Sequence, residues 1–316
     1  MRAPVILALA TVACVGVVGD DMVGSDSISL AFTAPGEGAG FTRDQLGVTG
    51  ALVAHIPVAV AIEGAPARVG LVAGTIAQPD LGSDGAGAAE FAVSGTTTLT
   101  ATAYDADDLA VATASVDVAI ADATPADCQA ELALYQVAFT AGPNNQGVAD
   151  PVTAMVPING VSFRSLGANN PRTTLFGDCK IVRSLARAAA IVRAHGIVEI
   201  SDLGVYNFRC IGGVGTPPDN CPNGISQHAF ANAIDLAGFT DGDGVFSSVN
   251  DDWIIDPDSE DTCEAAAEPG KDQFLHQLIC ELKDAGTWNI VLTPNYNSDH
   301  RNHFHVDLTP GSDFIE

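Results

Sequence analysis

The distribution of cysteines constrains the fold of this chain more than any other feature of the sequence. Six of the seven cysteines lie after residue 125, and the remaining one, Cys14, lies near the N-terminus. The six are Cys128, Cys179, Cys210, Cys221, Cys263 and Cys280. An even number indicates disulfides in an exported chain, and none of the six has the C-x-x-C spacing of a structural zinc site. We therefore expect disulfides within one C-terminal domain, and sequential pairing is the simplest arrangement.

The first residues predict export. Residues 1–19 have the features of a signal peptide, because a basic start precedes an almost unbroken apolar run that is too short to span a membrane. The tripeptide Thr-Val-Ala directly before Cys14 resembles a bacterial lipoprotein cleavage box, so lipidation of Cys14 is one prediction and ordinary signal cleavage is the alternative. Both predict a periplasmic or cell-surface protein, with or without a lipid anchor to the membrane.

The charge of the chain excludes one class of partner. Thirteen basic residues against 39 acidic residues give a formal net charge of −26. Such a charge repels nucleic-acid phosphates, so we expect no nucleic-acid partner. Hydrophobic residues make up 47% of the chain and charged residues 16%, a balance that predicts folded, globular domains. We expect the protein to be a monomer.

Residues 26–121 predict an all-β accessory domain. Stretches of alternating apolar and polar residues, such as HIPVAVAI, TTTLTATAY and VATASVDVAI, are separated by Gly, Pro and Asp. This pattern is typical of an immunoglobulin-like sandwich. The segment contains one His and no Cys, so we expect a spacer or a binding module there.

Residues 125–316 have a different pattern. Apolar residues at three- and four-residue spacing predict amphipathic helices over 128–139, 179–195 and 274–286. Shorter apolar runs predict strands over 197–206, 289–294 and 303–308. The fold class expected for this domain is therefore α+β.

Three of the histidines, His300, His303 and His305, are clustered in the sequence DHRNHFHVD. In a strand, side chains alternate between faces with a period of two residues. His303, His305 and Asp307 are therefore expected on one face, where two imidazoles and a carboxylate converge.

A second cluster contains His228 and Asp235, which small residues separate in SQHAFANAIDLAGF. Imidazole nitrogen and carboxylate oxygen are good zinc ligands, and three protein ligands leave a fourth position for water. Two histidines and one carboxylate also form the facial triad of non-haem Fe(II) oxygenases. That triad commonly begins with His-x-Asp, whereas six residues intervene here, so zinc is the preferred metal. A further alternative is that these polar groups merely satisfy one another in a core.

These residues carry a family resemblance. The pattern S-x-H-x6-D from Ser226 to Asp235, together with His303-x-His305, resembles the signature of zinc peptidases of the lysostaphin, D-Ala-D-Ala carboxypeptidase and hedgehog-fold group. Within that group, residues 128–308 most resemble the extensin-like C-terminal domain family of bacteria. The resemblance implies a hedgehog/DD-peptidase-like zinc domain over 125–316, preceded by the sandwich.

The resemblance also implies roles for individual residues. His228, Asp235 and His305 would bind Zn²⁺. His303 would lie beside the metal-bound water, and His300 corresponds to a further active-site histidine in some murein endopeptidases of the group. A zinc-bound water has a pKa of roughly 7 and can attack an amide carbonyl, and His303 is suited to take or relay the proton.

The function implied is a secreted or lipid-anchored zinc hydrolase that cleaves a peptide bond in peptidoglycan or acts on another cell-envelope polymer.

Two further residues are candidates for supporting roles. The planar guanidinium of Arg209 suits a substrate carboxylate, with a structural ion pair as the alternative. Ser226 is a candidate to orient His228, with a hydroxyl that only satisfies backbone groups as the alternative. The alternative function is a non-catalytic envelope-binding module with a structural zinc. A plant-type structural protein has no support, because the chain has no Ser-Pro-rich repeats.

Overall fold

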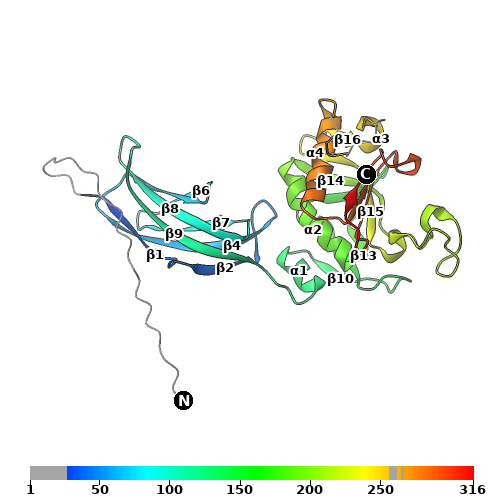
Figure 1. The fold of residues 1–316 in the computed structure, drawn as a ribbon, viewed down its shortest axis with the longest axis horizontal. Coiled ribbons are helices and arrows are strands. Elements are labelled where there is room, and N and C mark those ends of the chain that lie inside the picture. The colour runs from blue at the N-terminus through cyan, green and yellow to red at the C-terminus, as the bar shows by residue number, and fades with distance from the viewer. Residues whose placement is uncertain (1–26, 256–261, 265–266) are drawn as a thin grey trace, which may run out of the picture.

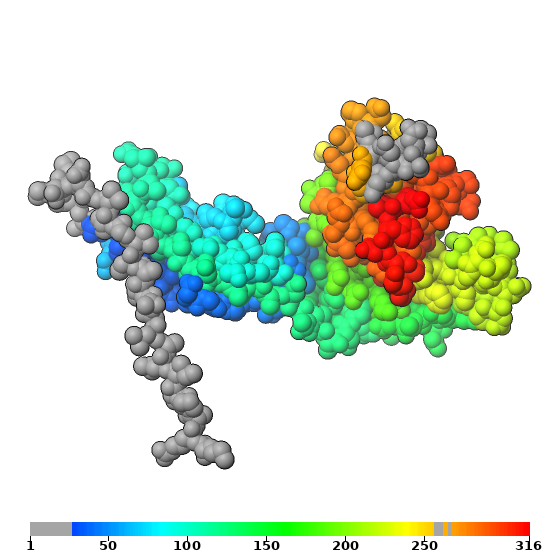
Figure 2. All heavy atoms as spheres, viewed as in Figure 1, coloured from blue at the N-terminus to red at the C-terminus, as the bar shows by residue number. Residues whose placement is uncertain are grey.

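The computed structural model describes residues 27–255, 262–264 and 267–316. Figure 1 shows a strand-rich N-terminal part and a mixed C-terminal part, and Figure 2 shows all heavy atoms from the same side. The predicted signal peptide and the lipidation site at Cys14 lie outside the described residues. None of the helices in the described part combines the length and apolar character needed to cross a membrane.

The N-terminal part is a β-sandwich. Its strands are β1 (Ser29–Ala34), β2 (Ala39–Arg43), β3 (Gln45–Leu46), β4 (Leu52–Glu63), β5 (Arg68–Ala73), β6 (Ile76–Leu81), β7 (Ala86–Phe91), β8 (Gly95–Tyr104) and β9 (Ala110–Asp122). One sheet has the order β1-β4-β3, with β7 also paired to β4, and the other has the order β2-β9-β8-β5-β6. Alternate side chains of both sheets, such as Val58, Leu71, Leu99 and Val118, form one buried core. The alternation in the sequence thus correctly predicted a sandwich.

The C-terminal part is α+β, as predicted. Its elements are α1 (Cys128–Leu134), β10 (Phe139–Ala141), β11 (Pro151–Met155), β12 (Ser162–Ser165), β13 (Thr174–Asp178), α2 (Cys179–Ala194), β14 (Ile197–Gly204), η1 (Ile211–Gly213), η2 (Gln227–Phe230), β15 (Ala233–Asp241), β16 (Phe246–Ser248), α3 (Val249–Asp252), α4 (Lys271–Asp284), β17 (Ile290–Leu292), η3 (Ser298–His300), β18 (Phe304–Asp307) and β19 (Phe314–Ile315). A seven-stranded sheet has the order β12-β14-β15-β18-β17-β19, with β16 paired to β15, and β10-β11-β13 form a second, three-stranded sheet.

Helices α2 and α4 bury apolar side chains in the same core as the large sheet. Leu185 of α2, Leu278 of α4 and Phe239 and Phe304 of the sheet are all fully or almost fully buried. Asp178 begins α2 by accepting a hydrogen bond from the backbone N–H of Lys180. This core fixes the central strands β15 and β18, which carry the candidate site.

The structure differs from the sequence-based expectation at the first helix and in strands of the C-terminal part that were not predicted. The first helix ends at Leu134 rather than continuing to Phe139, because Gln136 has a φ of 55° and turns the chain out of the helix. Strands β10 to β13 were not predicted, since each has at most five residues and too few alternations to be recognised.

The two parts of the chain touch through the segment between β3 and β4. Leu46 and Leu52 pack against the C-terminal core. The side-chain amide of Asn159 donates to the carbonyl oxygen of Gly50 at 2.7 Å and to that of Ala186, in α2, at 2.9 Å. Apolar packing and a bridging amide thus join the sandwich to the domain that carries α2.

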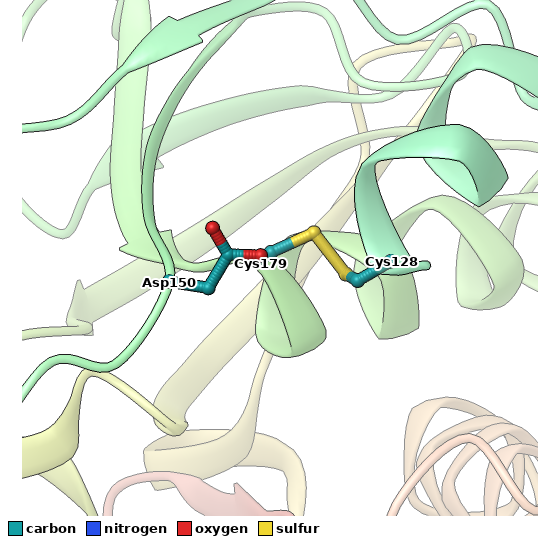
Figure 3. Close-up of side chains that lie close together, drawn as sticks. All are labelled: Cys128, Asp150 and Cys179. Atoms are coloured by element: carbon teal, nitrogen blue, oxygen red, sulfur yellow. A yellow bond between two sulfur atoms is a disulfide. The ribbon is translucent and has the colours of Figure 1, made fainter. Parts of the chain in front are cut away.

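The disulfides pair sequentially, as Cys128–Cys179, Cys210–Cys221 and Cys263–Cys280. Figure 3 shows the first of them, which joins the start of α1 to the start of α2, with Asp150 beside it. These three side chains have donor atoms close enough to hold a metal ion. The two sulfur atoms are bonded to each other, however, so neither is a thiolate ligand, and the group stabilises the fold.

We predict that the first disulfide stabilises the fold more than the second. Its cysteines are 51 residues apart in sequence, against 11 for Cys210–Cys221. Loop-closure entropy then gives roughly 4 kcal/mol for the first and roughly 3 kcal/mol for the second. Urea unfolding of the two double Cys→Ser variants measures the difference, and an equal or reversed order would contradict it.

Candidate metal centre

Two adjacent antiparallel strands bring the first two site residues together. In the pairing of β15 with β18, Asp235 lies directly opposite His305. Side chains of opposed residues lie on the same face of a sheet, with Cβ atoms about 5 Å apart. The Nδ1 atom of His305 is accordingly 2.9 Å from Oδ1 of Asp235. Asp235 lies in a strand that was not predicted, and the pairing of this strand with β18 is what aligns its carboxylate with His305.

His228 reaches the same carboxylate from the short helix η2. Ser226 begins this helix, and its Oγ accepts a hydrogen bond of 3.3 Å from the backbone N–H of His228. Ala231 ends it with a φ of 50°, so the chain turns sharply into β15. The buried ring of His228 therefore lies with Nε2 3.1 Å from Oδ1 of Asp235. Ser226 contacts the backbone of His228 and not its ring, so it orients the turn rather than the imidazole.

Three donor atoms converge at this point. Nε2 of His228, Nδ1 of His305 and a carboxylate oxygen of Asp235 lie within 4.8 Å of one another. The second ring nitrogen of each histidine is held elsewhere: Nδ1 of His228 donates to the carbonyl oxygen of Val205 at 2.8 Å, and Nε2 of His305 donates to Asp307 at 3.0 Å. Fixed outer nitrogens are a regular feature of metal-binding histidines. The donor set fits a zinc ion.

The contacts shift the pKa values of the two strand residues in opposite directions. Burial raises the pKa of Asp235, but hydrogen bonds from His228 and His305 outweigh burial and hold it well below its usual range. Burial lowers the pKa of His305, but its bonds to Asp235 and Asp307 outweigh burial and raise it to about 9. Near neutral pH the metal-free site therefore holds a carboxylate and an imidazolium, and a metal ion displaces a proton from His305.

His303 and His300 form an outer layer. Nε2 of His303 lies 3.4 Å from Oδ1 of Asp235, and its Nδ1 donates to Asn302 at 2.8 Å. The ring of His300 lies further out, with its centroid 5.2 Å from that of His303. Burial is the largest cause that lowers the pKa of His303, and burial likewise lowers the pKa of His300 to about 4. Both rings are therefore neutral at pH 7, and His303 presents an unprotonated nitrogen to Asp235.

A cavity of about 150 Å³ opens beside the convergence point. It is lined by Leu203, Gly204, Tyr206, Asn207, Arg209, His228 and Asp235. Arg209 is half-buried, and its positive charge contributes to the lowered pKa of His303. The next residue is tied by the Cys210–Cys221 disulfide, and the carbonyl oxygen of Arg209 accepts from the backbone N–H of Ser226 at 3.1 Å. The structure thus brings Arg209 to the wall of the cavity.

Two functional groups at the site differ from the sequence-based expectation. Asp307 was expected to face the same volume as His303 and His305, but its carboxylate lies behind His305, on the ring nitrogen that points away from Asp235. The two-residue alternation of side chains in a strand correctly indicated that Asp307 lies near His305. No sequence pattern could indicate the carbonyl oxygen of Val205 as a partner of His228, because it is a main-chain atom of a loop.

The fold and this cluster define the class: a disulfide-stabilised α+β domain that carries a His–Asp–His candidate metal centre. Residues 126–314 match the family described as the extensin-like protein C-terminus, and the chain belongs to this family. The match confirms the extensin-like part of the resemblance and covers every residue of the centre. Among curated proteins, none matches the chain.

Solved structures are similar at low levels. The chain matches the fibronectin(III)-like modules of CbhA from Clostridium thermocellum with 17% identity and a TM-score of 0.24, over 31% of this chain and 99% of that chain. It matches beta-glucuronidase 3 of Bacteroides uniformis with 11% identity and a TM-score of 0.20, over 44% of this chain and 19% of that chain. A beta-glucuronidase of Parabacteroides merdae matches with 10% identity and a TM-score of 0.22, over 71% of this chain and 24% of that chain.

We predict that the metal-free protein becomes less stable as the pH rises from 7 to 10. His305 has a pKa of about 9 in the folded chain, above the ordinary value of 6.5. Its bonds to Asp235 and Asp307 therefore stabilise the fold fully below pH 6.5, and this contribution is lost as the pH rises through 9. Urea unfolding in chelator measures the loss, which should be of the order of 2 kcal/mol. His305→Gln should lack this component, and an equal pH dependence in both proteins would contradict the prediction.

Proposed function

We propose that this protein is a zinc-dependent hydrolase of the bacterial cell envelope, exported to the periplasm or cell surface, that cleaves a peptide bond in peptidoglycan. The observation that carries the proposal is the convergence of His228, Asp235 and His305 beside a cavity that also contains an arginine. The proposal includes a domain of the hedgehog and D-Ala-D-Ala carboxypeptidase type. When bound, zinc polarises a carbonyl oxygen and lowers the pKa of its water to about 7.

His303 is the proposed proton acceptor. Its Nδ1 proton is held by Asn302, so Nε2 carries the lone pair and faces Asp235. Because its pKa is lowered by burial, the ring is unprotonated at pH 7 and is able to accept a proton from water. His300 packs against His303 and restricts the orientation of its ring.

Arg209 is the proposed substrate-binding residue. A guanidinium donates paired hydrogen bonds to a carboxylate, and peptidoglycan stem peptides carry such groups. Arg209 lines the cavity together with His228 and Asp235, and its Nε makes no hydrogen bond within the described part of the chain. This Nε is buried and has no partner among the described residues, so the guanidinium at the cavity wall is not held by a hydrogen bond at that atom.

The second candidate function is a non-catalytic envelope-binding module with a structural zinc. One observation favours it: Nε2 of His303 is only 3.4 Å from Oδ1 of Asp235, within reach of a metal ion held there. Binding of this nitrogen would give four protein ligands, which is the closed arrangement of structural zinc sites. The role of His303 therefore separates the two functions.

We predict about one zinc per chain in the wild type, loss of zinc in His228→Ala and His305→Ala, and retention in His303→Ala. Metal content by mass spectrometry measures this and also distinguishes zinc from iron. His195→Ala is the matched control, because His195 ends α2 and bonds Glu281, away from the site. Loss of zinc in His303→Ala would favour the closed site, and no metal in the wild type after supply of zinc would contradict both functions.

We also predict that His303→Ala lowers the rate of peptidoglycan digestion by about 10²- to 10⁴-fold with zinc retained, which is the usual range for loss of a general base. Arg209→Ala should raise KM more than it lowers kcat, and Arg209→Lys should restore only part of the affinity, because an ammonium lacks the planar fork. Release of soluble fragments from purified sacculi provides the assay. Undiminished digestion by His303→Ala would exclude its role as proton acceptor.

A further inference from the structure

We infer that Asp307 is a positioning residue that determines which nitrogen of His305 faces the metal. The inference rests on the proposed metal site and adds to it a residue that acts only through His305. Asp307 lies in β18, two positions after His305, with 4% of its surface exposed. Its Oδ2 atom is 3.0 Å from Nε2 of His305.

The carboxylate of Asp307 is itself held in place. Oδ1 accepts a hydrogen bond of 2.8 Å from the backbone N–H of Thr309, and the carbonyl oxygen accepts one of 2.9 Å from the backbone N–H of Asn289. Strand β18 lies between β15 and β17, where Asp307 pairs with Ala233 on one side and Ile290 on the other. Because its backbone and Oδ1 are both held, the buried carboxylate of Asp307 presents Oδ2 to His305 in one fixed orientation.

The consequence for His305 follows from the chemistry of imidazole. A neutral ring has one N–H and one lone pair, and the hydrogen bond of one nitrogen determines the state of the other. An ionised carboxylate only accepts hydrogen bonds, so Asp307 keeps the proton on Nε2. In the metal-free protein Nδ1 donates to Oδ1 of Asp235 at 2.9 Å, and once the ring is neutral the lone pair is left on this same Nδ1.

His228 shows the opposite arrangement. The carbonyl oxygen of Val205 binds Nδ1 of His228, so that ring presents Nε2 to Asp235. His228 therefore presents Nε2 to Asp235, whereas His305 presents Nδ1. In each ring the other nitrogen donates to an acceptor that lies on the side away from Asp235. Without Asp307, His305 is free to hold its proton on either nitrogen and to rotate, and both changes remove a lone pair from the site.

The test compares zinc affinity and ring protonation in Asp307→Ala and Asp307→Asn. Competition with a chromogenic chelator gives the zinc affinity of the full chain. Asp307→Ala should weaken it by about 10- to 100-fold, the usual effect of removing an outer partner of a metal-binding histidine. Asp307→Asn should lose less, since its amide oxygen still accepts, and it guards against a fold failure of the Ala variant.

Nitrogen-15 NMR provides a readout that a purely structural role would not move. In the metal-free wild type, the Nε2 proton of His305 should exchange slowly with water, and in Asp307→Ala it should exchange rapidly. Asp272→Asn is the matched control. Asp272 lies in α4, is also buried, and accepts hydrogen bonds from the backbone N–H groups of Ile254 and Glu268. It should lower the melting temperature and leave both readouts unchanged.

The outcomes separate the two proposals. Unchanged zinc affinity in both Asp307 variants, with the Nε2 proton still protected, would overturn the positioning role. Absence of zinc binding in the wild type would overturn the proposed function, while loss of the protected proton in Asp307→Ala would still support the action of Asp307 on His305. A fall in melting temperature alone, with both readouts unchanged, would reduce Asp307 to a structural residue.

Discussion

The antiparallel pairing of β15 with β18 is the interaction on which the rest of the site depends. It sets Asp235 opposite His305, although the two residues are 70 positions apart in sequence. A shift of one residue would turn His305 to the other face of the sheet. The register is held by the buried core, in which Ile234, Leu236, Phe304 and Val306 lie on these same two strands. Packing of the core thus determines the geometry of a polar site.

One carboxylate organises the electrostatics of this site. Asp235 contacts His228, His303 and His305, each through a ring nitrogen within 3.4 Å of the same oxygen. In the metal-free protein the carboxylate stabilises positive charge on His305, while His303 stays neutral. Arg209 adds a positive charge at the wall of a cavity in a chain whose net charge is −26. The positive charges of His305 and Arg209 thus lie beside the negative charge of Asp235.

The sequence predicted the helices, the longer strands and the motif residues better than it predicted how they pack together. The alternation of apolar and polar residues in the N-terminal strands predicted a sandwich, and the apolar spacing predicted α2 and α4. Both patterns repeat several times within one element, since the longest of these strands have 10 to 13 residues and the helices have 16 and 14. The short strands β10 to β13 carry too few residues for such a pattern. The motifs identified His228, Asp235 and His305, but strand register and the carbonyl of Val205 depend on tertiary structure. Asp307 was expected at the site from its spacing, and only the structure placed it behind His305.

The central claim is that two imidazoles and one carboxylate of this domain hold a zinc ion with a position left for water. X-ray absorption at the zinc edge of the purified protein tests it most directly. The account predicts only nitrogen and oxygen neighbours, with scattering from two imidazoles. Scattering from a third imidazole would contradict an open site and assign His303 as a ligand. Sulfur neighbours, or no zinc at all, would contradict the site itself.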